Sequence, residues 1–159
     1  MWYRWTEAIS EKKVFYGYTL GNHDSEADLT RRQIVDLDML HPYSLTKQAE
    51  APGYGASTFV IPVMSSKNPE EVVMNLWFFD SEDYNCLGVL AAIHPSLTLT
   101  PDRDELLDSL REVIDWYRQK SAELEKTQGG KKPGVAFMHI APPEYMFAYD
   151  VSERATDNV

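Results

Sequence analysis

The stretch MNLWFFDS, residues 74–81, decides the fold because it is the clearest buried strand in the chain. Its apolar and aromatic residues run without interruption from Leu76 and end at Asp80, which is typical of a strand inside a core. Before it, residues 58–64 (TFVIPVM) form a second strand candidate, and the spacer SSKNPEE is rich in turn-forming residues. We therefore expect an antiparallel hairpin of residues 58–64 and 72–79.

A long helix and another strand are predicted after the hairpin. Thr100-Pro101 is a typical helix start, with Thr as the N-cap, Pro at the first helical position and acidic residues behind it. GGKKPG ends this helix after about Lys126 and leads into GVAFMHI, residues 134–140, a short buried strand. Between the two ends the apolar residues recur at helical spacing: Leu106, Leu110, Val113, Ile114, Tyr117 and Leu124.

The residues before the hairpin predict two more helices and one more strand. Residues 1–11 carry apolar side chains at helical spacing. Residues 14–20 alternate and are rich in aromatic residues, which favours a strand. Ser25 or Asp28 can cap a helix that reaches about Leu40, and a loop rich in Pro and Gly follows. This mixed order of helices and strands predicts an α/β fold of the α+β type.

Length and composition are those of one globular domain. The chain has 159 residues, of which 43% are hydrophobic and 25% are charged, the usual proportions of a folded protein. We expect residues 1–150 to form the domain and residues 151–159 to be a disordered tail. The net charge of −10 argues against a nucleic acid or an anionic membrane as partner, because either one needs a basic surface.

The number of cysteines and the first residues of the chain indicate the cellular location to expect. Cys86 is the only cysteine, so neither an internal disulfide nor a cysteine zinc site can form. The start, MWYRWTEAISEKK, lacks the apolar segment of a secretory signal peptide. No run approaches the roughly 18 apolar residues of a membrane span. We expect a soluble protein, with the cytoplasm favoured.

Two groups of residues that can carry chemistry follow predicted strands. Asn22, His23 and Asp24 come directly after residues 14–20, and His139 ends GVAFM. In α/β folds, ligands bind beyond the carboxyl ends of strands. One division of roles places Asn22 toward a metal ion and His23 toward a substrate, with Asp24 behind His23 to fix its tautomer.

Each of these residues also has a simpler structural explanation. GNHD can be a plain turn in which Gly and Asn supply positive φ angles. His139 can be a core histidine bonded to a backbone group, and Asp80 can be a cap at a strand end. His41 and His94, each followed by proline, are expected at the surface, and the aromatic face of the long helix is expected to pack in the core.

Four blocks of sequence together resemble the calcineurin-like metallophosphoesterases, in particular the purple-acid-phosphatase-like branch of fungi and plants. The blocks are GNHDSE (21–26), LWFFDSEDY (76–84), IDWY (114–117) and GVAFMHIAPPEY (134–145). The resemblance extends from Val14 to about Tyr149, and residues 86–100 match least well.

The resemblance implies a β-sandwich flanked by helices, with two metal ions (Mn, Fe or Zn) at the strand ends that hydrolyse a phosphomonoester. Asn22 and His139 resemble ligands of the second metal ion. His23 resembles the histidine that contacts the phosphate and protonates the leaving oxygen, and Asp24 resembles the acid that orients this histidine. A phosphorylated substrate is the expected partner, and the oligomeric state stays open.

The chain also departs from the family pattern. The family blocks Asp-x-His and Gly-Asp, expected upstream of GNHD, and Gly-His-x-His, expected downstream of MHI, have no match here. We therefore expect the central portion of a phosphoesterase domain, with an exposed edge strand. Asn22 and His139 are both neutral, so weak or partial metal occupancy is expected.

Three functional interpretations follow. The first is a metal-dependent phosphoesterase of which this chain is a portion. The second is a degenerate phosphoesterase fold that binds or regulates a partner without catalysis, which the acidic surface and the missing ligand blocks favour. The third is a metal-free α/β domain whose GNHD is only a turn.

Overall fold

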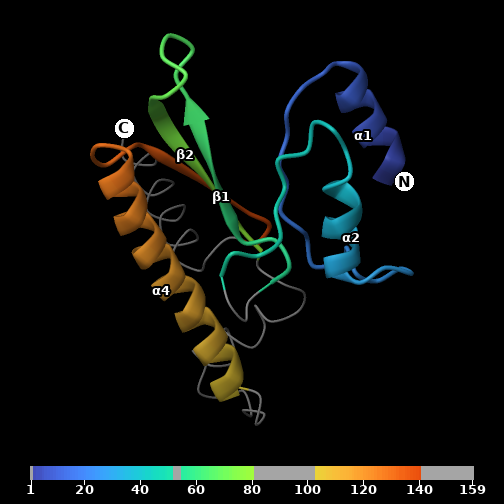
Figure 1. The fold of residues 1–159 in the computed structure, drawn as a ribbon. Coiled ribbons are helices and arrows are strands. Elements are labelled where there is room, and N and C mark those ends of the chain that lie inside the picture. The colour runs from blue at the N-terminus through green and yellow to red at the C-terminus, as the bar shows by residue number, and fades with distance from the viewer. Residues whose placement is uncertain (1, 52–54, 81–102, 141–159) are drawn as a thin grey trace, which may run out of the picture.

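The elements form a mixed α/β arrangement in which one sheet lies between helices (Figure 1). The computed structural model describes residues 2–51, 55–80 and 103–140, with side chains described from residue 6 in the first range and from residue 111 in the last. Within these ranges the helices and strands are α1 (Trp2–Glu11), α2 (Arg31–Asp38), β1 (Phe59–Met64), β2 (Val72–Phe79), α4 (Arg103–Thr127) and β3 (Gly134–Met138).

The three strands form a mixed sheet in the order β1-β2-β3. β1 and β2 pair antiparallel, with Phe59 opposite Phe78 and a shift in register between Val63 and Met64. This confirms the predicted hairpin. β2 and β3 pair in parallel, with Phe78 opposite Phe137, because the segment containing α4 carries the chain back to the start of the sheet.

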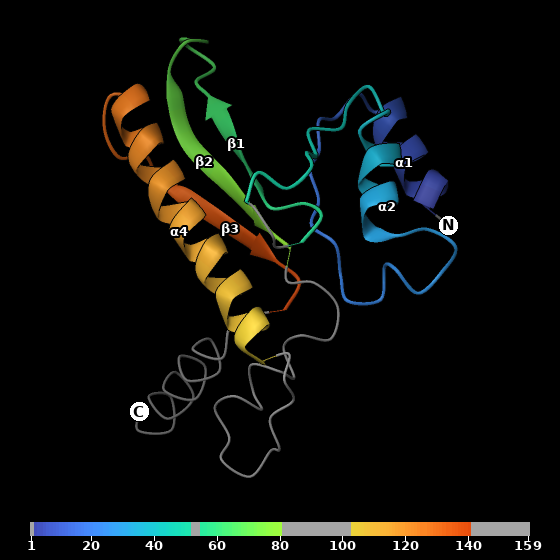
Figure 2. The same cartoon turned by 60° about the horizontal axis from the view of Figure 1, so that its bottom comes forward.

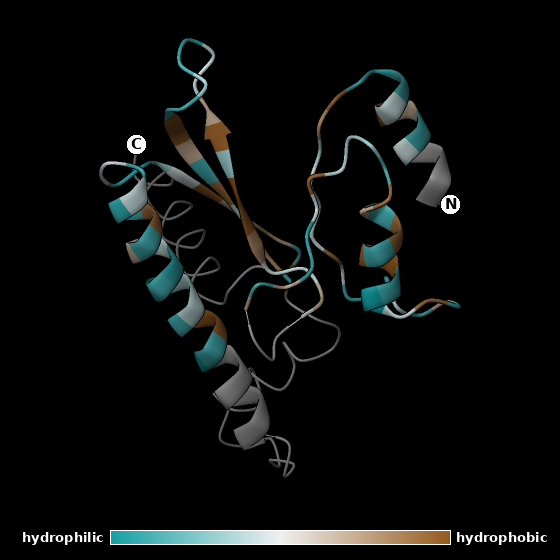
Figure 3. Ribbon diagram, viewed as in Figure 1, coloured by the Kyte–Doolittle hydropathy of each residue, from teal (hydrophilic) through white to brown (hydrophobic). Residues whose placement is uncertain are grey.

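The core of the hairpin consists of aromatic and branched side chains. Phe59, Val60, Trp77 and Phe78 are buried. The rings of Phe59 and Phe78 stack with centroids 4.7 Å apart, and Phe78 stacks at 5.1 Å on Phe137 of β3. Figure 3 shows apolar residues along β1 and β2 and mainly polar residues on the outer side of α4.

Helix α4 lies along the sheet, as both orientations show (Figures 1 and 2). Trp77 meets Trp116 and Tyr117 edge to face, with centroids 5.9 Å and 4.7 Å apart, a favourable arrangement for aromatic pairs. The aromatic face of the long helix therefore packs on the sheet, but Tyr117 keeps 41% of its surface exposed, so the predicted burial in the core is only partial. The predicted start of this helix at Thr100-Pro101 lies outside the described residues.

The predicted strand within residues 134–140 is present as β3, but the prediction that it is buried is wrong, because all five of its residues are exposed. Val135, Phe137 and Met138 keep 40%, 43% and 37% of their surface open to solvent. β3 is an outer strand of the described sheet, so the expected exposed edge strand is present.

The predicted strand over residues 14–20 is wrong. These residues are extended, but Tyr16 forms only an isolated bridge with Ser44. Tyr16 N–H donates to the carbonyl of Tyr43, and Leu45 N–H donates to the carbonyl of Tyr16. The next contact ends the ladder, since Tyr18 N–H donates to a side chain, Thr46 Oγ1.

The N-cap of helix α2 lies five residues after the first predicted cap, Ser25. Thr30 is the N-cap: its hydroxyl accepts from the N–H of Gln33, and the Gln33 side chain accepts from the N–H of Thr30. This reciprocal pair is a capping box and satisfies two N–H groups that have no partner within the helix. α1 and α2 lie close together on the side of the sheet away from α4 (Figures 1 and 2).

Two further observations complete the fold. Among the helices in the described ranges, none combines the length and apolar character needed to span a membrane. The described strands form a single sheet, and the expected disordered tail, residues 151–159, lies outside the described residues.

Candidate functional site

Two of the predicted site residues meet in space although 117 positions separate them in the sequence. Asn22 Oδ1 lies 3.0 Å from Nε2 of His139. Asn22 follows the extended residues 14–20, and His139 follows the last residue of β3. The structure thus brings together the two residues that the resemblance assigns to one metal ion.

Gly21 makes this approach possible. A Cβ at this position would lie 3.2 Å from Cε1 and from Nε2 of His139, tighter than side chains normally pack. Neither Gly21 nor Asn22 has a positive φ. GNHD does form a turn, in which the N–H of Asp24 donates to the carbonyl of Gly21, but the expected positive φ angles are absent. The glycine is needed because an imidazole ring lies against its α-carbon.

His23 and Asp24 lie at the surface beside this contact. The side chain of His23 is 66% exposed, and its Nδ1 is 2.6 Å from Oε1 of Glu26. Asp24 Oδ2 accepts a hydrogen bond of 2.6 Å from the N–H of Gly21. Glu26 thus takes the position at Nδ1 that we expected for Asp24, whereas the Asp24 carboxylate closes the turn.

A buried ion pair lies behind the same turn. Asp80, directly after β2, is fully buried, and its Oδ1 accepts from Nη2 of Arg31. Its Oδ2 accepts from the N–H of Ala56 at 2.7 Å. Arg31 also donates through Nη1 to the carbonyl of Gly21 at 2.7 Å. Asp80 is therefore more than the strand-end cap that the sequence predicted, since it links Arg31 to the GNHD turn.

A second buried carboxylate, Asp38, is the last residue of α2, the helix that begins with Arg31. Asp38 Oδ1 accepts from the hydroxyl of Tyr16 at 2.8 Å, and Oδ2 accepts from Oγ of Ser44 at 2.5 Å. Burial raises the pKa of Tyr16 well above its usual range, and the Asp38 carboxylate reinforces the shift. Burial also raises the pKa of Tyr18, with the charges of Asp38 and Asp24 adding to the effect.

The donor atoms at the site suit part of the shell of a metal ion. With ligand bonds of about 2.1 Å, two donors at right angles lie about 3.0 Å apart, the separation of Asn22 Oδ1 and His139 Nε2. Without a cation the same contact is a hydrogen bond. Within the described ranges no group of three or more His, Cys, Asp or Glu side chains is placed to hold a metal ion, so these two residues fit a cation as a partial ligand set.

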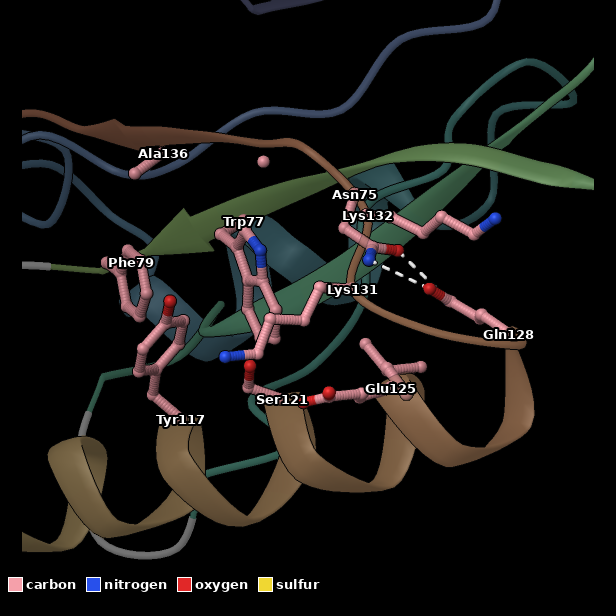
Figure 4. Close-up of a pocket in the computed structure, with 12 residues that line it drawn as sticks. Asn75, Trp77, Phe79, Tyr117, Ser121, Glu125, Gln128, Lys131, Lys132 and Ala136 are labelled. Carbon is pink, nitrogen blue, oxygen red and sulfur yellow. Dashed lines mark hydrogen bonds between the residues drawn. The ribbon is translucent and has the colours of Figure 1, made fainter.

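A cavity of about 560 Å³ lies between α4 and the sheet (Figure 4). Asn75 and Gln128 exchange two hydrogen bonds across it, of 3.0 Å and 3.1 Å. Trp77 and Tyr117 contribute aromatic walls, and the remaining lining includes Lys131 and Lys132. None of the predicted site residues lines this cavity, which runs along the strands rather than beyond the end of β3.

Comparison with known proteins identifies distant relatives. The chain is 27% identical over 142 residues to "Phosphatase DCR2" of Saccharomyces cerevisiae, covering 87% of this chain. It is 29% identical over 161 residues to "Probable inactive purple acid phosphatase 29" of Arabidopsis thaliana, covering 92% of this chain. This chain is therefore a distant relative of a phosphatase and of a purple-acid-phosphatase-like protein.

The relationship confirms the resemblance drawn from the four sequence blocks. The chain spans 22% and 38% of the length of these two relatives. No protein-family model and no solved structure matches it.

Among the residues in and around this turn, sequence patterns did not single out Glu26, Arg31 or the burial of Asp80. Two signals point to the last two. A carboxylate at the end of a buried apolar strand needs a partner. Arg31 stands at the first position of α2, where a cation is unfavourable to the helix dipole unless another group binds it. Glu26 gives no comparable signal, because it lies in an acidic loop.

Proposed function

We propose that this chain contributes one wall of a metal-dependent phosphoesterase site that hydrolyses phosphomonoesters, within a β-sandwich of which the described sheet is a part. The observation that carries the proposal is the meeting of Asn22 and His139, 3.0 Å apart. In the proposed site these two residues hold one of two cations, and His23 faces the phosphate.

The chemistry of the chain's own residues supports these roles. Bound cations would supply Lewis-acid stabilisation of the phosphoryl oxygens. Glu26 at Nδ1 of His23 favours the tautomer with its proton on that nitrogen, so proton transfer by this ring would use Nε2. Asp24 keeps the turn closed through the Gly21 N–H, and it thereby holds His23 next to Asn22.

Metal binding tests the first part of the proposal. Titration of the purified chain with Mn²⁺, followed by electron paramagnetic resonance, should show a site that His139→Ala weakens at least tenfold. His41→Ala is the matched control, because His41 lies three residues beyond the last residue of α2 and outside the candidate site. Equal Mn²⁺ affinity in the wild type and His139→Ala would exclude His139 as a ligand.

Hydrolysis tests the second part. With added Mn²⁺, the chain should release 4-nitrophenol from 4-nitrophenyl phosphate, and His23→Ala should lower the rate about a hundredfold or more, the usual contribution of an acid–base residue. Activity that survives His23→Ala would remove this residue from the mechanism.

A second candidate function is phosphate-ligand or partner binding without catalysis. Two observations favour it: the two converging donors are both neutral, and one relative carries the words "probable inactive" in its name. Elemental analysis separates the candidates, because near-stoichiometric Mn, Fe or Zn in the purified protein would exclude the non-catalytic, metal-free site.

A further inference from the structure

We infer that Arg31 and Asp80 are positioning residues for the candidate site. Asp80 holds the Arg31 guanidinium, and Arg31 holds the Gly21 carbonyl at the angle that lets Asn22 reach His139. The consequence for metal binding rests on the proposed function, whereas the positioning itself is a property of the metal-free chain.

Contacts other than the one with Arg31 hold Asp80 in place. Its own N–H donates to Thr58 Oγ1 at 3.2 Å, and its Oδ2 accepts from Ala56 N–H at 2.7 Å. Gly55 packs its backbone directly on this carboxylate: its φ is +69°, and a Cβ there would lie 2.6 Å from Cβ of Asp80. The remaining oxygen, Oδ1, is thus presented at one place, where Arg31 binds it.

Arg31 connects three segments of the chain. It is the first residue of α2, whose start the capping box of Thr30 fixes. One guanidinium nitrogen binds Asp80 at the end of β2, and another donates to the carbonyl of Gly21 at 2.7 Å. The planar guanidinium presents its donors in a rigid fork, so the direction of one bond determines the direction of the other. The side chain is 13% exposed, which limits alternative conformations.

Holding the Gly21 carbonyl orients Asn22. The Gly21 carbonyl and the Asn22 N–H belong to one planar peptide unit, so the bond from Arg31 sets the orientation of that plane and of the Asn22 α-carbon. Asp24 holds the Gly21 N–H at 2.6 Å on the other side. Both peptide groups of Gly21 are therefore held, and the His139 ring lies against the α-carbon between them.

Stability alone does not explain this pair. A buried ion pair is often replaceable by apolar residues without loss of stability, so its contribution to folding and its effect on the site can be separated by experiment. Arg32 offers a matched control, because it is the neighbouring arginine on α2, is exposed, and donates to Gln48 at 3.2 Å instead of to the turn.

The direct test is the contact between residues 21–22 and His139 in the metal-free protein. Nuclear Overhauser effects should join the His139 ring protons to the Gly21 α-protons and to the Asn22 side-chain amide. Arg31→Lys should abolish them, since one ammonium group cannot reproduce the two-armed fork. Arg32→Lys should leave them unchanged. Retention of these signals in Arg31→Lys would overturn the inference.

A second variant separates positioning from folding. The double change Arg31→Met with Asp80→Asn removes the buried charges together, and Asn can still accept from Ala56 N–H. We expect it to keep the packed hairpin, seen in the Trp77 indole signal, and to lose the contact of His139 with Gly21. A folded double variant that keeps this contact would contradict the role of Arg31.

Mn²⁺ titration then distinguishes the inference from the proposed function. If both hold, Arg31→Lys should weaken Mn²⁺ binding about tenfold or more, as the loss of groups that orient ligands does, and Arg32→Lys should not. If the wild type binds no Mn²⁺ but Arg31→Lys still loses the His139 contact, the positioning stands and the proposed function fails. If Mn²⁺ binds equally well to wild type and Arg31→Lys, the positioning fails and the proposed function stands.

Discussion

Asp38 and Asp80 are two fully buried carboxylates that this fold stabilises in different ways. Asp80 receives a cation, Arg31, and a backbone N–H. Asp38 receives two neutral hydroxyl groups, those of Tyr16 and Ser44. The charged partner, Arg31, also contacts Gly21 of the candidate site, whereas the two hydroxyl groups belong to residues outside it.

The difference teaches what each carboxylate does for its surroundings. The side-chain partners of Asp38 named above are both neutral. Burial raises the pKa of Tyr16, and the Asp38 carboxylate beside it adds to this shift. Asp80 forms an ion pair with Arg31, and a second nitrogen of the Arg31 guanidinium donates to the carbonyl of Gly21. Helix α2 carries one member of each network, Arg31 at its first residue and Asp38 at its last.

The largest expected effect is that of removing Asp80. Asp80→Ala leaves the Arg31 guanidinium buried without its carboxylate, which should lower the free energy of unfolding by about 3–5 kcal/mol. Asp38→Ala leaves only hydroxyl groups without an acceptor and should lower it by about 1–3 kcal/mol. Urea unfolding followed by tryptophan fluorescence measures both, and equal losses would show that the cation makes no difference.

The next effect is that of the glycine packed on Asp80. Gly55→Ala meets both a positive φ and a collision with Asp80, so it should lower the free energy of unfolding by about 2–4 kcal/mol. Gly129→Ala is the control, because its φ is +71° and no atom lies within 4 Å of the added Cβ. Gly129→Ala should lower the free energy of unfolding by only about 1 kcal/mol. An equal decrease in both variants would mean that Asp80 moves aside for the added Cβ at little cost.

The pH dependence tests the neutral network around Asp38. In the folded chain the pKa of Tyr16 is raised above its usual value, so the unfolded chain loses this proton first as the pH rises past about 10. Stability is therefore full below that pH and falls above it, by up to about 1.4 kcal/mol per pH unit for one tyrosine. Urea unfolding between pH 8 and 11 should show that the free energy of unfolding falls less steeply with pH in Tyr16→Phe than in the wild type. An unchanged slope would show that Tyr16 does not cause the fall.

The smallest expected effect is at the cap that joins the two networks. Thr30→Ala removes the capping box of α2 and should lower the free energy of unfolding by about 0.5–1 kcal/mol. Since α2 carries a partner in each network, Thr30→Ala should weaken the contact of His139 with Asn22 and also reduce the upward shift of the Tyr16 pKa. Both can be followed by nuclear magnetic resonance. A change in only one of the two would show that the networks are independent.

Sequence patterns predicted the hairpin, the long helix and β3 because each depends on local periodicity and turn chemistry. They predicted the extended shape of residues 14–20 but not its pairing, which depends on residues 43–46. The start of α2 was placed too early because Ser25 and Asp28 are as suitable for capping as Thr30. In the structure it is Thr30 that closes a reciprocal pair with Gln33, and this pair marks the true start of the helix.

The candidate site was predictable in part for a similar reason. The resemblance placed Asn22 and His139 together, and the structure brings them within 3.0 Å. The roles of Arg31 and Asp80 depend on a contact across 49 positions, and no spacing rule connects such residues. Glu26 replaces Asp24 beside His23 because the turn uses the Asp24 carboxylate for its own N–H.

The exposed outer strand β3 has a consequence for the behaviour of the chain in solution. An apolar strand with an open edge is a template for association between molecules, and Val135, Phe137 and Met138 are all accessible on it. The net charge of −10 keeps copies of the chain apart at neutral pH through mutual repulsion. This protection is lost near the isoelectric point of about 4.8, so association between copies of the chain is expected to be strongest there.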